Sequence, residues 1–257
     1  MDVRNEWFGR NNNNGTVSFR FGPMNCGKTR DTVTAMQNRH HEGGNIICYN
    51  HAANSRDGDC LAVDGERQMP AVLTSTLDEL ILDLEMQVNK IFSRKVNEQG
   101  EQGKIEINGI THRKYRPVVA IAIDEVNLYA MNSTDSEDLL DFFDWCREVG
   151  LNVYSSGLMY DFRGRDFGHI RSILPRIEHI LPVTSAKCKS VHQGQVCGEP
   201  AYNSQRVWRL DFLHSQKLEE IGEGMALYDF ADKEGETIVG QYVAAPFFDR
   251  TLRIEEA

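Results

Sequence analysis

The sequence predicts an α/β fold: a P-loop NTPase-like, mostly parallel sheet flanked by helices, followed by a smaller C-terminal domain. Three observations support this fold class. A β-branched and aromatic segment, residues 16–21, runs directly into the glycine-containing residues 22–29. Apolar segments alternate with helical patterns as far as about Pro182, which is typical of parallel sheets. Residues 118–123 form a continuous apolar run, as expected of a strand that is buried on both faces.

The individual elements follow from apolar spacing and from residues that begin or end helices. The predicted strands of the main sheet are residues 16–21, 45–49, 118–123 and 151–156. The predicted helices run from the glycine-containing loop to about residue 38, over residues 77–92 and over residues 135–149. Ser75 and Asp78 predict a capping box before the second helix, and Gly150 ends the third. Residues 104–110 indicate an additional hairpin.

These elements divide the chain into three regions that differ in composition and in secondary-structure pattern. We expect a flexible N-terminal segment over residues 1–15, which is polar and contains an asparagine run. The α/β domain should cover residues 16–182, with an insertion at about 96–116. Residues 183–257 contain short strand-like pieces without a clear helix pattern, and they predict the smaller domain.

Composition narrows the choice of partners and of cellular compartment. The chain has 257 residues and a formal net charge of -10, whereas proteins that grip duplex DNA usually carry a positive surface. No apolar run approaches the roughly 20 residues that cross a bilayer, and no secretion signal is recognisable. We therefore expect a cytoplasmic protein without nucleic-acid or membrane partners. The six cysteines are then expected to be reduced thiols or metal ligands rather than disulfides.

Residues 22–29 carry the strongest chemical signal in the chain. They fit the pattern G-x-x-x-x-G-K-[ST] in full, with a strand expected before them and a helix after them. Glycines let backbone N–H groups curl around an anion, and the start of the helix presents its positive end to phosphates. Lys28 can reach the β- and γ-phosphates, and the Thr29 hydroxyl can ligate Mg²⁺. This pattern predicts a nucleotide triphosphate site.

Two adjacent carboxylates, Asp124 and Glu125, end the apolar run 118–123. P-loop proteins place the acid that serves Mg²⁺ at such a position. Neighbouring side chains on a strand diverge, so one carboxylate can serve the metal while the other faces an acceptor and takes a proton from its hydroxyl. An Asp-Glu pair by itself is more often a solvated surface feature. The end of a buried strand in a P-loop chain favours the functional interpretation.

Four segments resemble the cytosolic-type (type II) thymidine kinases. GPMNCGKT at 22–29 is similar to the family's G-P-M-x-S-G-K-[ST] loop, and IDEVNLY at 123–129 looks like its I-D-E-x-Q-F-F segment. GLMYDFRGRDF at 157–167 is similar to G-L-x-x-D-F-R-G-x-x-F. Residues 184–188 and 197–206 resemble the start of the family's zinc-bearing lasso domain. These segments occur in the family's order and cover most of residues 19–242.

The resemblance implies roles for the matched positions. The triphosphate is bound by Lys28 with Gly22, Pro23, Met24, Asn25, Cys26, Gly27 and Thr29. Thr29 and Asp124 serve Mg²⁺, and Glu125 matches the glutamate that acts as general base for the nucleoside 5′-hydroxyl. The nucleoside-binding positions are Met24, Arg56, Leu128, Leu158, Phe162, Phe167, Ser204 and Tyr242. The resemblance also implies a homotetramer with a lasso-type C-terminal domain. Phe162, Phe167 and Tyr242 offer flat apolar faces suited to a base, and plain core packing is the alternative for each.

The lasso region departs from the family pattern at the zinc site. Cys188 and Cys197 are candidate zinc ligands, but an inserted stretch separates them. The expected second pair falls near Pro246 and Asp249, which cannot rebuild it, so half of the expected ligands are missing. His192 could join the two cysteines, and a closed structural zinc site needs four ligands.

Two further departures concern the nucleoside side of the site. Leu128 stands where the family has an aromatic residue that packs on the base. Asn127 replaces a glutamine and Asn54 replaces an aspartate, so base preference or affinity could shift.

The insertion at about 96–116 is longer than the family's link into the strand that ends at Asp124. It could cap the site, lie at a subunit contact, or be inert.

The leading hypothesis is therefore ATP- and Mg²⁺-dependent phosphorylation of a deoxynucleoside, with thymidine first, at its 5′-hydroxyl. One alternative is a P-loop ATPase or a kinase with another acceptor. A second is a degenerate nucleotide-binding regulatory protein, which the altered zinc half-site suggests. The intact set of Lys28, Thr29, Asp124 and Glu125 argues against the second, because an idle site needs none of them.

Overall fold

The computed structural model divides into two units, which are described separately. The first comprises residues 1–21, 27–159 and 167–182, and the second comprises 22–26, 160–166 and 183–257. The structure describes residues 7–8, 14–23, 26–54, 58–63, 66–93, 103–161, 165–183, 186, 191–192, 195–196, 203–209, 241–245 and 254–255.

The first unit is built on a six-stranded sheet in the order β10-β1-β9-β8-β2-β5. All five neighbouring strand pairs are parallel. The strands are β1 Val17–Phe21, β2 Asn45–His51, β5 Val72–Thr74, β8 Val118–Ile123, β9 Asn152–Gly157 and β10 His179–Pro182. This sheet confirms the predicted α/β fold. Its edge strands β5 and β10 were not predicted, because both are very short.

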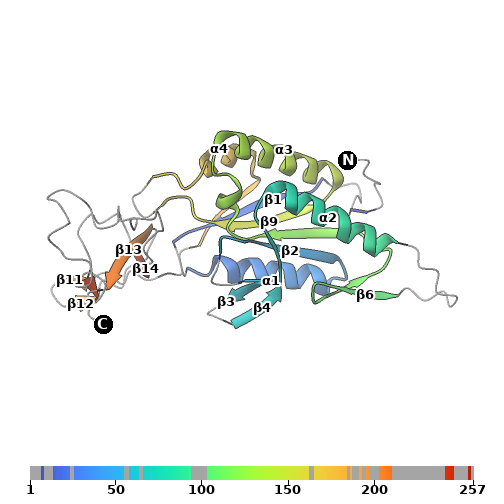
Figure 1. Cartoon of the computed structure of the whole chain (residues 1–257), viewed down its shortest axis with the longest axis horizontal. Coiled ribbons are helices and arrows are strands. Elements are labelled where there is room, and N and C mark those ends of the chain that lie inside the picture. The colour runs from blue at the N-terminus through green and yellow to red at the C-terminus, as the bar shows by residue number, and fades with distance from the viewer. Residues whose placement is uncertain are drawn as a thin grey trace. The chain divides into compact units, whose positions relative to one another are not determined.

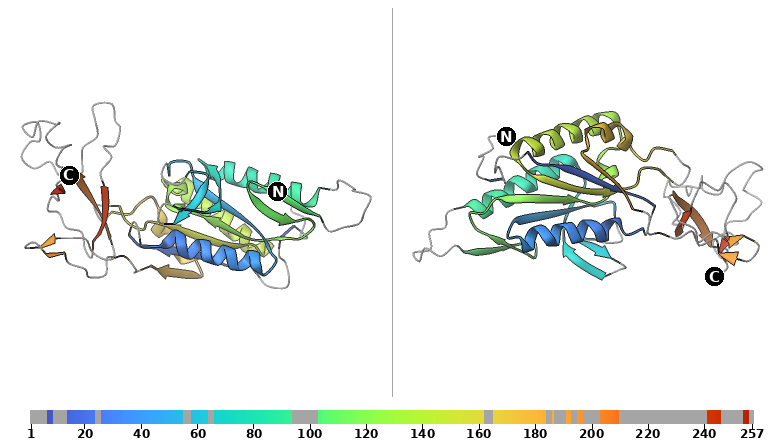
Figure 2. Two further views of the ribbon diagram at one scale, coloured as in Figure 1. Left: turned by 90° about the horizontal axis from the view of Figure 1, so that it is seen from below. Right: turned by 180° about the vertical axis from the view of Figure 1, so that it is seen from behind.

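Helices cover both faces of the sheet (Figures 1 and 2). Helix α1, Lys28–His41, lies on one face, and α2, Leu77–Phe92, lies with α3, Ser133–Val149, on the other. Alternate residues of β2 enter separate cores: Ile46 and Cys48 pack with Met36 of α1, whereas Ile47 and Tyr49 join the core of α2 and α3. This division explains why the central strands read as unbroken apolar runs.

Helix ends follow local side-chain chemistry. The α2 N-cap is Thr76, whose side chain accepts the Glu79 N–H at 3.2 Å, while Glu79 accepts the Ser75 N–H at 2.6 Å. The predicted capping box at Ser75 and Asp78 is therefore wrong by one residue. Two overlapping boxes are possible, Ser75 with Asp78 and Thr76 with Glu79, and the second forms because the longer Glu79 side chain reaches back to the chain before the helix.

The ends of α3 agree more closely with expectation. The helix starts two residues earlier than predicted, because the Asn132 side chain accepts the Asp135 N–H at 2.9 Å. It ends as predicted at Gly150, whose φ of 80° lies in the left-handed region that favours glycine.

The remaining elements are short. In the first unit they are the hairpins β3 Cys60–Val63 with β4 Glu66–Pro70 and β6 Lys104–Ile107 with β7 Ile110–Arg113, and the helical turns η1 Val126–Tyr129, α4 Ile170–Ile173 and η2 Leu174–Arg176. In the second unit they are the strands β11 Val191–His192, β12 Gln195–Val196, β13 Asn203–Arg209, β14 Gln241–Ala245 and β15 Ile254–Glu255. None of the helices in the part of the chain that the structure describes could cross a membrane.

Part of the N-terminal segment packs on the first unit. Phe8 is buried and forms an isolated bridge with Val118, whose N–H donates to the Trp7 carbonyl at 2.9 Å. Its ring meets Trp145 edge-on at 5.3 Å, and the Trp7 ring stacks on Phe92 at 6.3 Å. Two aromatic residues in a polar stretch are the sequence signal for this anchor.

The β6–β7 hairpin of the insertion is fastened to the amino-terminal edge of the sheet. Asn45, the first residue of β2, accepts the Arg113 N–H at 2.7 Å and donates to the carbonyls of Arg113 and Arg116 at 2.8 and 2.9 Å. Asn45 pairs with Val118, the first residue of β8. Because the strands are parallel, this edge is opposite to the carboxyl ends that carry Asp124. The described hairpin therefore does not cap the predicted site.

His112 of this hairpin predicts a dependence of stability on pH. It is 1% exposed, and neither ring nitrogen has a hydrogen-bond partner among the described residues. Burial, with a smaller contribution from nearby His40, lowers the pKa of His112 to about 4. The folded state thus binds fewer protons than the unfolded state between about pH 4 and pH 6.5, so stability falls as the pH falls through this window.

Replacing His112 by leucine should remove this penalty. We expect His112→Leu to raise the free energy of unfolding, with a gain about 2 kcal/mol larger at pH 5 than at pH 8. Urea denaturation at both pH values measures the difference. The exposed His41 provides the control, since His41→Leu should change stability by less than about 0.5 kcal/mol at either pH. Equal gains for His112→Leu at the two pH values would contradict the prediction.

Candidate active site

Two of the residues predicted to bind phosphate, Gly27 and Lys28, form the start of α1. Gly27 is the N-cap of α1 and has φ 94° and ψ 13°, a left-handed conformation that glycine adopts without steric cost. No side chain caps this helix start, so its first amide groups point their hydrogens outward as an anion site requires. Lys28 follows and is only 7% exposed. Burial of this ammonium at a helix N-terminus favours an anionic ligand.

Steric hindrance requires glycine at the first position of the motif. A Cβ on Gly22 would lie 2.5 Å from the Val183 carbonyl oxygen and 2.7 Å from the Cys26 sulfur, all within the second unit. Contacts under 3 Å with backbone atoms do not occur, so a larger residue would displace the chain. Both glycines of the motif therefore occupy positions that favour glycine, Gly22 by space and Gly27 by its backbone conformation.

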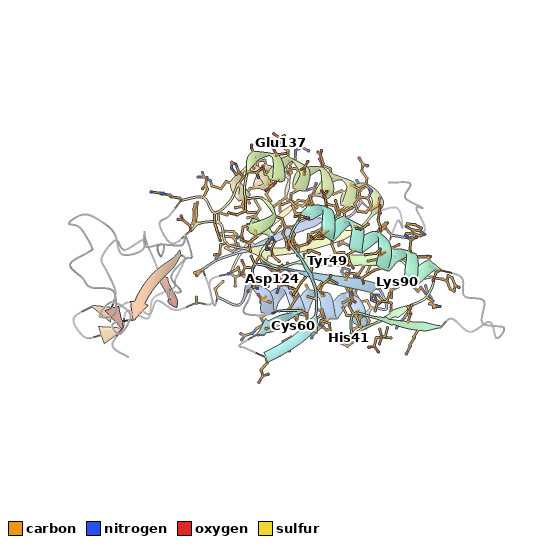
Figure 3. All side chains as sticks on the ribbon, in the orientation of Figure 1. His41, Tyr49, Cys60, Lys90, Asp124 and Glu137 are labelled. Atoms are coloured by element: carbon orange, nitrogen blue, oxygen red, sulfur yellow. The ribbon has the colours of Figure 1, made fainter. Side chains whose placement is uncertain are left out.

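A buried carboxylate stands beside the start of α1. Asp124 is 2% exposed, and its Oδ2 accepts a hydrogen bond from the Thr29 hydroxyl at 3.0 Å. The Ser156 hydroxyl of β9 donates to the other oxygen at 2.5 Å. Figure 3 shows Asp124 at the end of the sheet opposite to His41 and Lys90. Residues from β8, β9 and α1 therefore converge on one carboxyl group.

Burial raises the pKa of Asp124, and four groups oppose that rise, the Glu125 backbone among them. The hydrogen bonds from Ser156 and Thr29 and the charge of Lys28 each stabilise the ionised form. Ser156 was not among the predicted site residues. It could have been found from its place at the end of the strand next to β8, since the carboxyl ends of neighbouring parallel strands meet at one edge.

The donor set fits a magnesium ion. Mg²⁺ prefers oxygen ligands, and P-loop proteins hold it through the loop Ser/Thr and a strand-end aspartate. Thr29 and Asp124 are these two residues, and their oxygens lie 3.0 Å apart. For a second predicted metal, zinc, the two candidate ligands Cys188 and Cys197 lie outside the described residues. Within the described part of the chain, no group of three or more His, Cys, Asp or Glu side chains could hold a metal ion.

Glu125 sits in a turn with unusual backbone geometry. It has φ 53° and ψ 43°, in the left-handed region, and it is the N-cap of η1. Whereas Asp124 is fully enclosed, Glu125 is half-buried. The turn closes when the Leu128 N–H donates to the Glu125 carbonyl at 2.9 Å. Non-glycine residues in this conformation often occur at functional sites.

Three of the predicted nucleoside-binding residues lie on adjoining segments of the first unit. Leu128, Leu158 and Phe167 are each half-buried. The Leu158 N–H donates to the Asn127 side chain at 2.9 Å, and the Phe167 N–H donates to the Met159 carbonyl at 3.1 Å. These contacts tie the turn after β8 to the chain after β9 and to the segment before α4.

The other predicted binding residues lie largely beyond what the structure describes. Met24, Asn25, Arg56 and Phe162 are outside the described residues. Ser204 lies in β13 and Tyr242 in β14, and Tyr242 pairs with Arg206 across this antiparallel ladder. Their backbones are described and their side chains are not.

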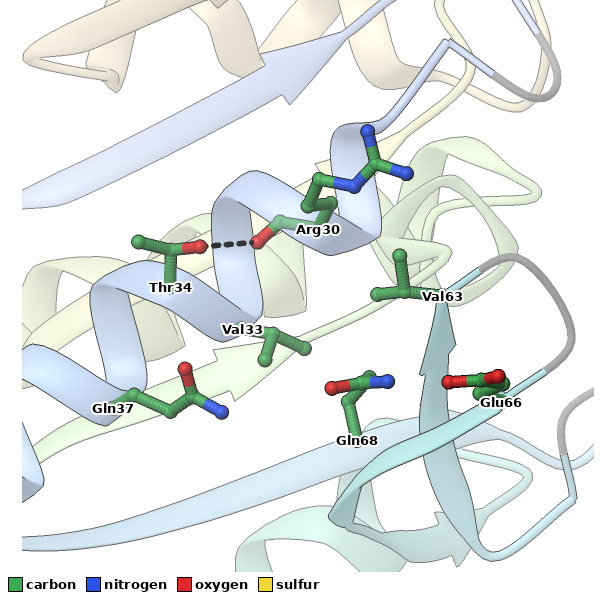
Figure 4. A pocket seen from close by; sticks show the side chains of 7 residues that line it. All are labelled: Arg30, Val33, Thr34, Gln37, Val63, Glu66 and Gln68. Atoms are coloured by element: carbon green, nitrogen blue, oxygen red, sulfur yellow. Dashed lines mark hydrogen bonds between the residues drawn. The ribbon is translucent and has the colours of Figure 1, made fainter.

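A hollow of about 310 Å³ lies elsewhere on the first unit, between α1 and the β3–β4 hairpin (Figure 4). Its lining residues are Arg30, Val33, Thr34, Gln37, Val63, Glu66 and Gln68. The Thr34 hydroxyl is engaged with the Arg30 carbonyl at 2.9 Å. None of the predicted site residues lines this hollow.

Comparison with known proteins finds a similar enzyme. No protein-family model matches the chain. A thymidine kinase of Thermococcus kodakarensis is 26% identical to it over 188 residues, which are 72% of this chain and 76% of that protein.

The two hydroxyl groups of Ser155 and Ser156 allow the Asp124 hydrogen bond to be tested. Both serines are fully buried, but Ser155 donates to the Ser18 carbonyl at 2.9 Å, whereas Ser156 donates to the carboxylate. We expect Ser156→Ala to lower the free energy of unfolding by about 1.5–3 kcal/mol, and Ser155→Ala by about 0.5–1.5 kcal/mol. Urea denaturation gives both values.

The pH dependence of these losses is a sharper measurement. Loss of the Ser156 hydrogen bond should raise the pKa of Asp124 further. A folded carboxyl group with a raised pKa binds more protons than the unfolded one, so its cost grows as the pH rises above the ordinary carboxyl range. The Ser156→Ala loss should therefore be larger at pH 8 than at pH 5, and the Ser155→Ala loss should be the same. Parallel pH profiles would show that Asp124 is not the group affected.

Proposed function

We propose that the chain is a nucleoside kinase that transfers a phosphoryl group from ATP to the 5′-hydroxyl of a deoxynucleoside, with thymidine as the preferred substrate. The observation that carries the proposal is the convergence of Thr29, Ser156 and Asp124 at the start of α1, with Glu125 next in the chain. The 26% identity with a thymidine kinase supports the choice of acceptor.

The donor side of the site would hold the triphosphate of ATP. The first amides of α1 and the buried ammonium of Lys28 attract the phosphates. Thr29 and Asp124 would hold Mg²⁺, which when bound offsets charge on the phosphoryl oxygens. Because Asp124 is enclosed and tied by two hydroxyl groups, its carboxylate is fixed before any ligand arrives. Preorganised charge of this kind contributes strongly to phosphoryl transfer.

The acceptor side would be organised by Glu125. Its half-buried carboxylate would take the proton from the 5′-hydroxyl as that oxygen attacks the γ-phosphorus. Leu128, Leu158 and Phe167 offer apolar surface for base and sugar. We extend this set, as a proposal, to Met24, Arg56, Phe162, Ser204 and Tyr242. A homotetramer and a zinc ion at Cys188 and Cys197 remain predictions from the resemblance, and a cytoplasmic location remains a prediction from the composition.

A panel of nucleosides in a coupled ADP-release assay tests the proposal. Thymidine is expected to give the highest kcat/KM, with stoichiometric formation of its monophosphate. ADP release that ignores every nucleoside would favour the ATPase alternative. ATP binding without any turnover would favour the regulatory alternative.

Glu125→Gln should separate binding from chemistry. The amide keeps the size of the side chain but cannot accept the proton, so kcat should fall by about 100-fold or more. The dissociation constant for ATP, measured by calorimetry, should change by less than about threefold because the phosphate contacts are untouched. Glu137→Gln on the exposed face of α3 is the matched control and should retain full turnover. Unchanged kcat in Glu125→Gln would remove this residue from the mechanism.

A further inference from the structure

Asn127 is a fully enclosed polar side chain next to the candidate active site. It is 0% exposed and lies in η1, two residues after Glu125. Its Oδ1 accepts the Leu158 N–H at 2.9 Å, and among the described residues its Nδ2 has no hydrogen-bond partner. A buried donor without an acceptor costs about 1–3 kcal/mol, so a residue of this kind needs a reason to be retained.

Two glycines pack closely against Asn127, and neither could carry a larger side chain without displacing it. A Cβ on Gly157 would lie 2.3 Å from the Asn127 Oδ1, so only glycine fits at the end of β9. Gly168 has φ 65°, and a Cβ there would lie 2.7 Å from the Asn127 carbonyl oxygen. Three segments thus meet on one residue: the turn after β8, the exit of β9 and the approach to α4.

The turn held in this way is the one that carries Glu125. A glutamate in the left-handed conformation costs about 1–2 kcal/mol relative to the ordinary one, and it persists only where its surroundings fix it. The hydrogen bond from Leu158 to Asn127 is a direct side-chain link between this turn and the chain after β9. Leu158 is also one of the residues proposed to face the nucleoside.

We propose that Asn127 is a positioning residue that locks the Glu125 turn to Leu158 and thereby fixes the general base relative to the acceptor nucleoside. The inference rests on the proposed function and adds to it a residue that contacts neither ATP nor metal. Loss of the link should impair use of the nucleoside and leave ATP binding intact, whereas a general loss of stability would affect both substrates.

The link itself can be tested without any enzymatic assay. In Asn127→Ala the Leu158 N–H loses its acceptor, so hydrogen exchange in the peptide covering residues 152–160 should become at least tenfold faster. Asn127→Asp keeps an oxygen at the same place and should retain slow exchange. Strand β8, residues 118–123, serves as the internal reference, because unfolding of the domain would accelerate exchange there too. Unchanged exchange in Asn127→Ala, with β8 still protected, would overturn the proposal.

A double-mutant cycle with Gly157 tests the consequence for activity. Gly157→Ala should raise the KM for thymidine or lower kcat, giving at least a tenfold loss of kcat/KM, because the new Cβ displaces the Asn127 side chain. Asn127→Ala should give a loss of similar size. In the double variant the clash is absent, so its loss should match that of Asn127→Ala alone rather than the product of the two. The KM for ATP should stay within about twofold throughout.

Multiplied losses in the double variant, or a KM for ATP that rises in proportion to the loss of kcat/KM for thymidine, would refute the positioning role. If the wild-type protein phosphorylates no nucleoside, the proposed function fails. The exchange measurement then decides the link between Asn127 and Leu158 by itself, so the two failures are distinguishable.

Discussion

The enclosed carboxyl group of Asp124 is the constraint on which the first unit depends. A carboxylate removed from water is costly unless donors surround it, and here the donors come from separate elements, Thr29 of α1 and Ser156 of β9. Their hydroxyl groups reach Asp124 only if β8 and β9 are adjacent and in register, and only if α1 starts at the same edge. The sheet order and the helix position are thus the conditions under which this group can be buried.

The carboxyl edge of the sheet presents two chemically different surfaces, one at the start of α1 and one at the turn after β8. The α1 side presents amide dipoles and an ammonium, which suit an anion, while the turn after β8 presents a half-buried carboxylate and apolar side chains. The two sides are joined through the chain between Asp124 and Glu125. The two adjacent acids thus lie in different environments, Asp124 enclosed and Glu125 half-buried.

Much of the fold was readable from the sequence because its main signals are local. The Gly-Lys-Thr helix start, the apolar run 118–123 and the Gly150 helix end each depend on a few consecutive residues. The edge strands β5 and β10 were missed, because three or four residues carry too little pattern to be recognised. The capping residue of α2 was misplaced because two overlapping boxes exist, and the one that forms has the longer Glu79 side chain at its third helical position.

Within the candidate site, the sequence indicated the residues that are proposed to act on ligands but not the residues that position their side chains. Ser156 and Asn127 owe their roles to neighbours more than twenty-five residues away, as the contacts with Asp124 and Leu158 show. No periodicity or motif reports such pairs. Gly157 was recognised as part of a resembling segment, but the reason for its size, the Asn127 oxygen beside it, required the three-dimensional structure.

The β6–β7 hairpin is attached to the sheet through the side chain of Asn45, and this mode of attachment bears on how far the length of the hairpin can vary. All three hydrogen bonds of the Asn45 side chain go to backbone groups of residues 113 and 116, so the anchor does not depend on the identity of the side chains in the hairpin. Segments at this edge can be lengthened, shortened or replaced while the opposite edge keeps its geometry. The amino-terminal rim of the sheet is therefore the natural place to attach a fluorescent label or an affinity handle to this protein.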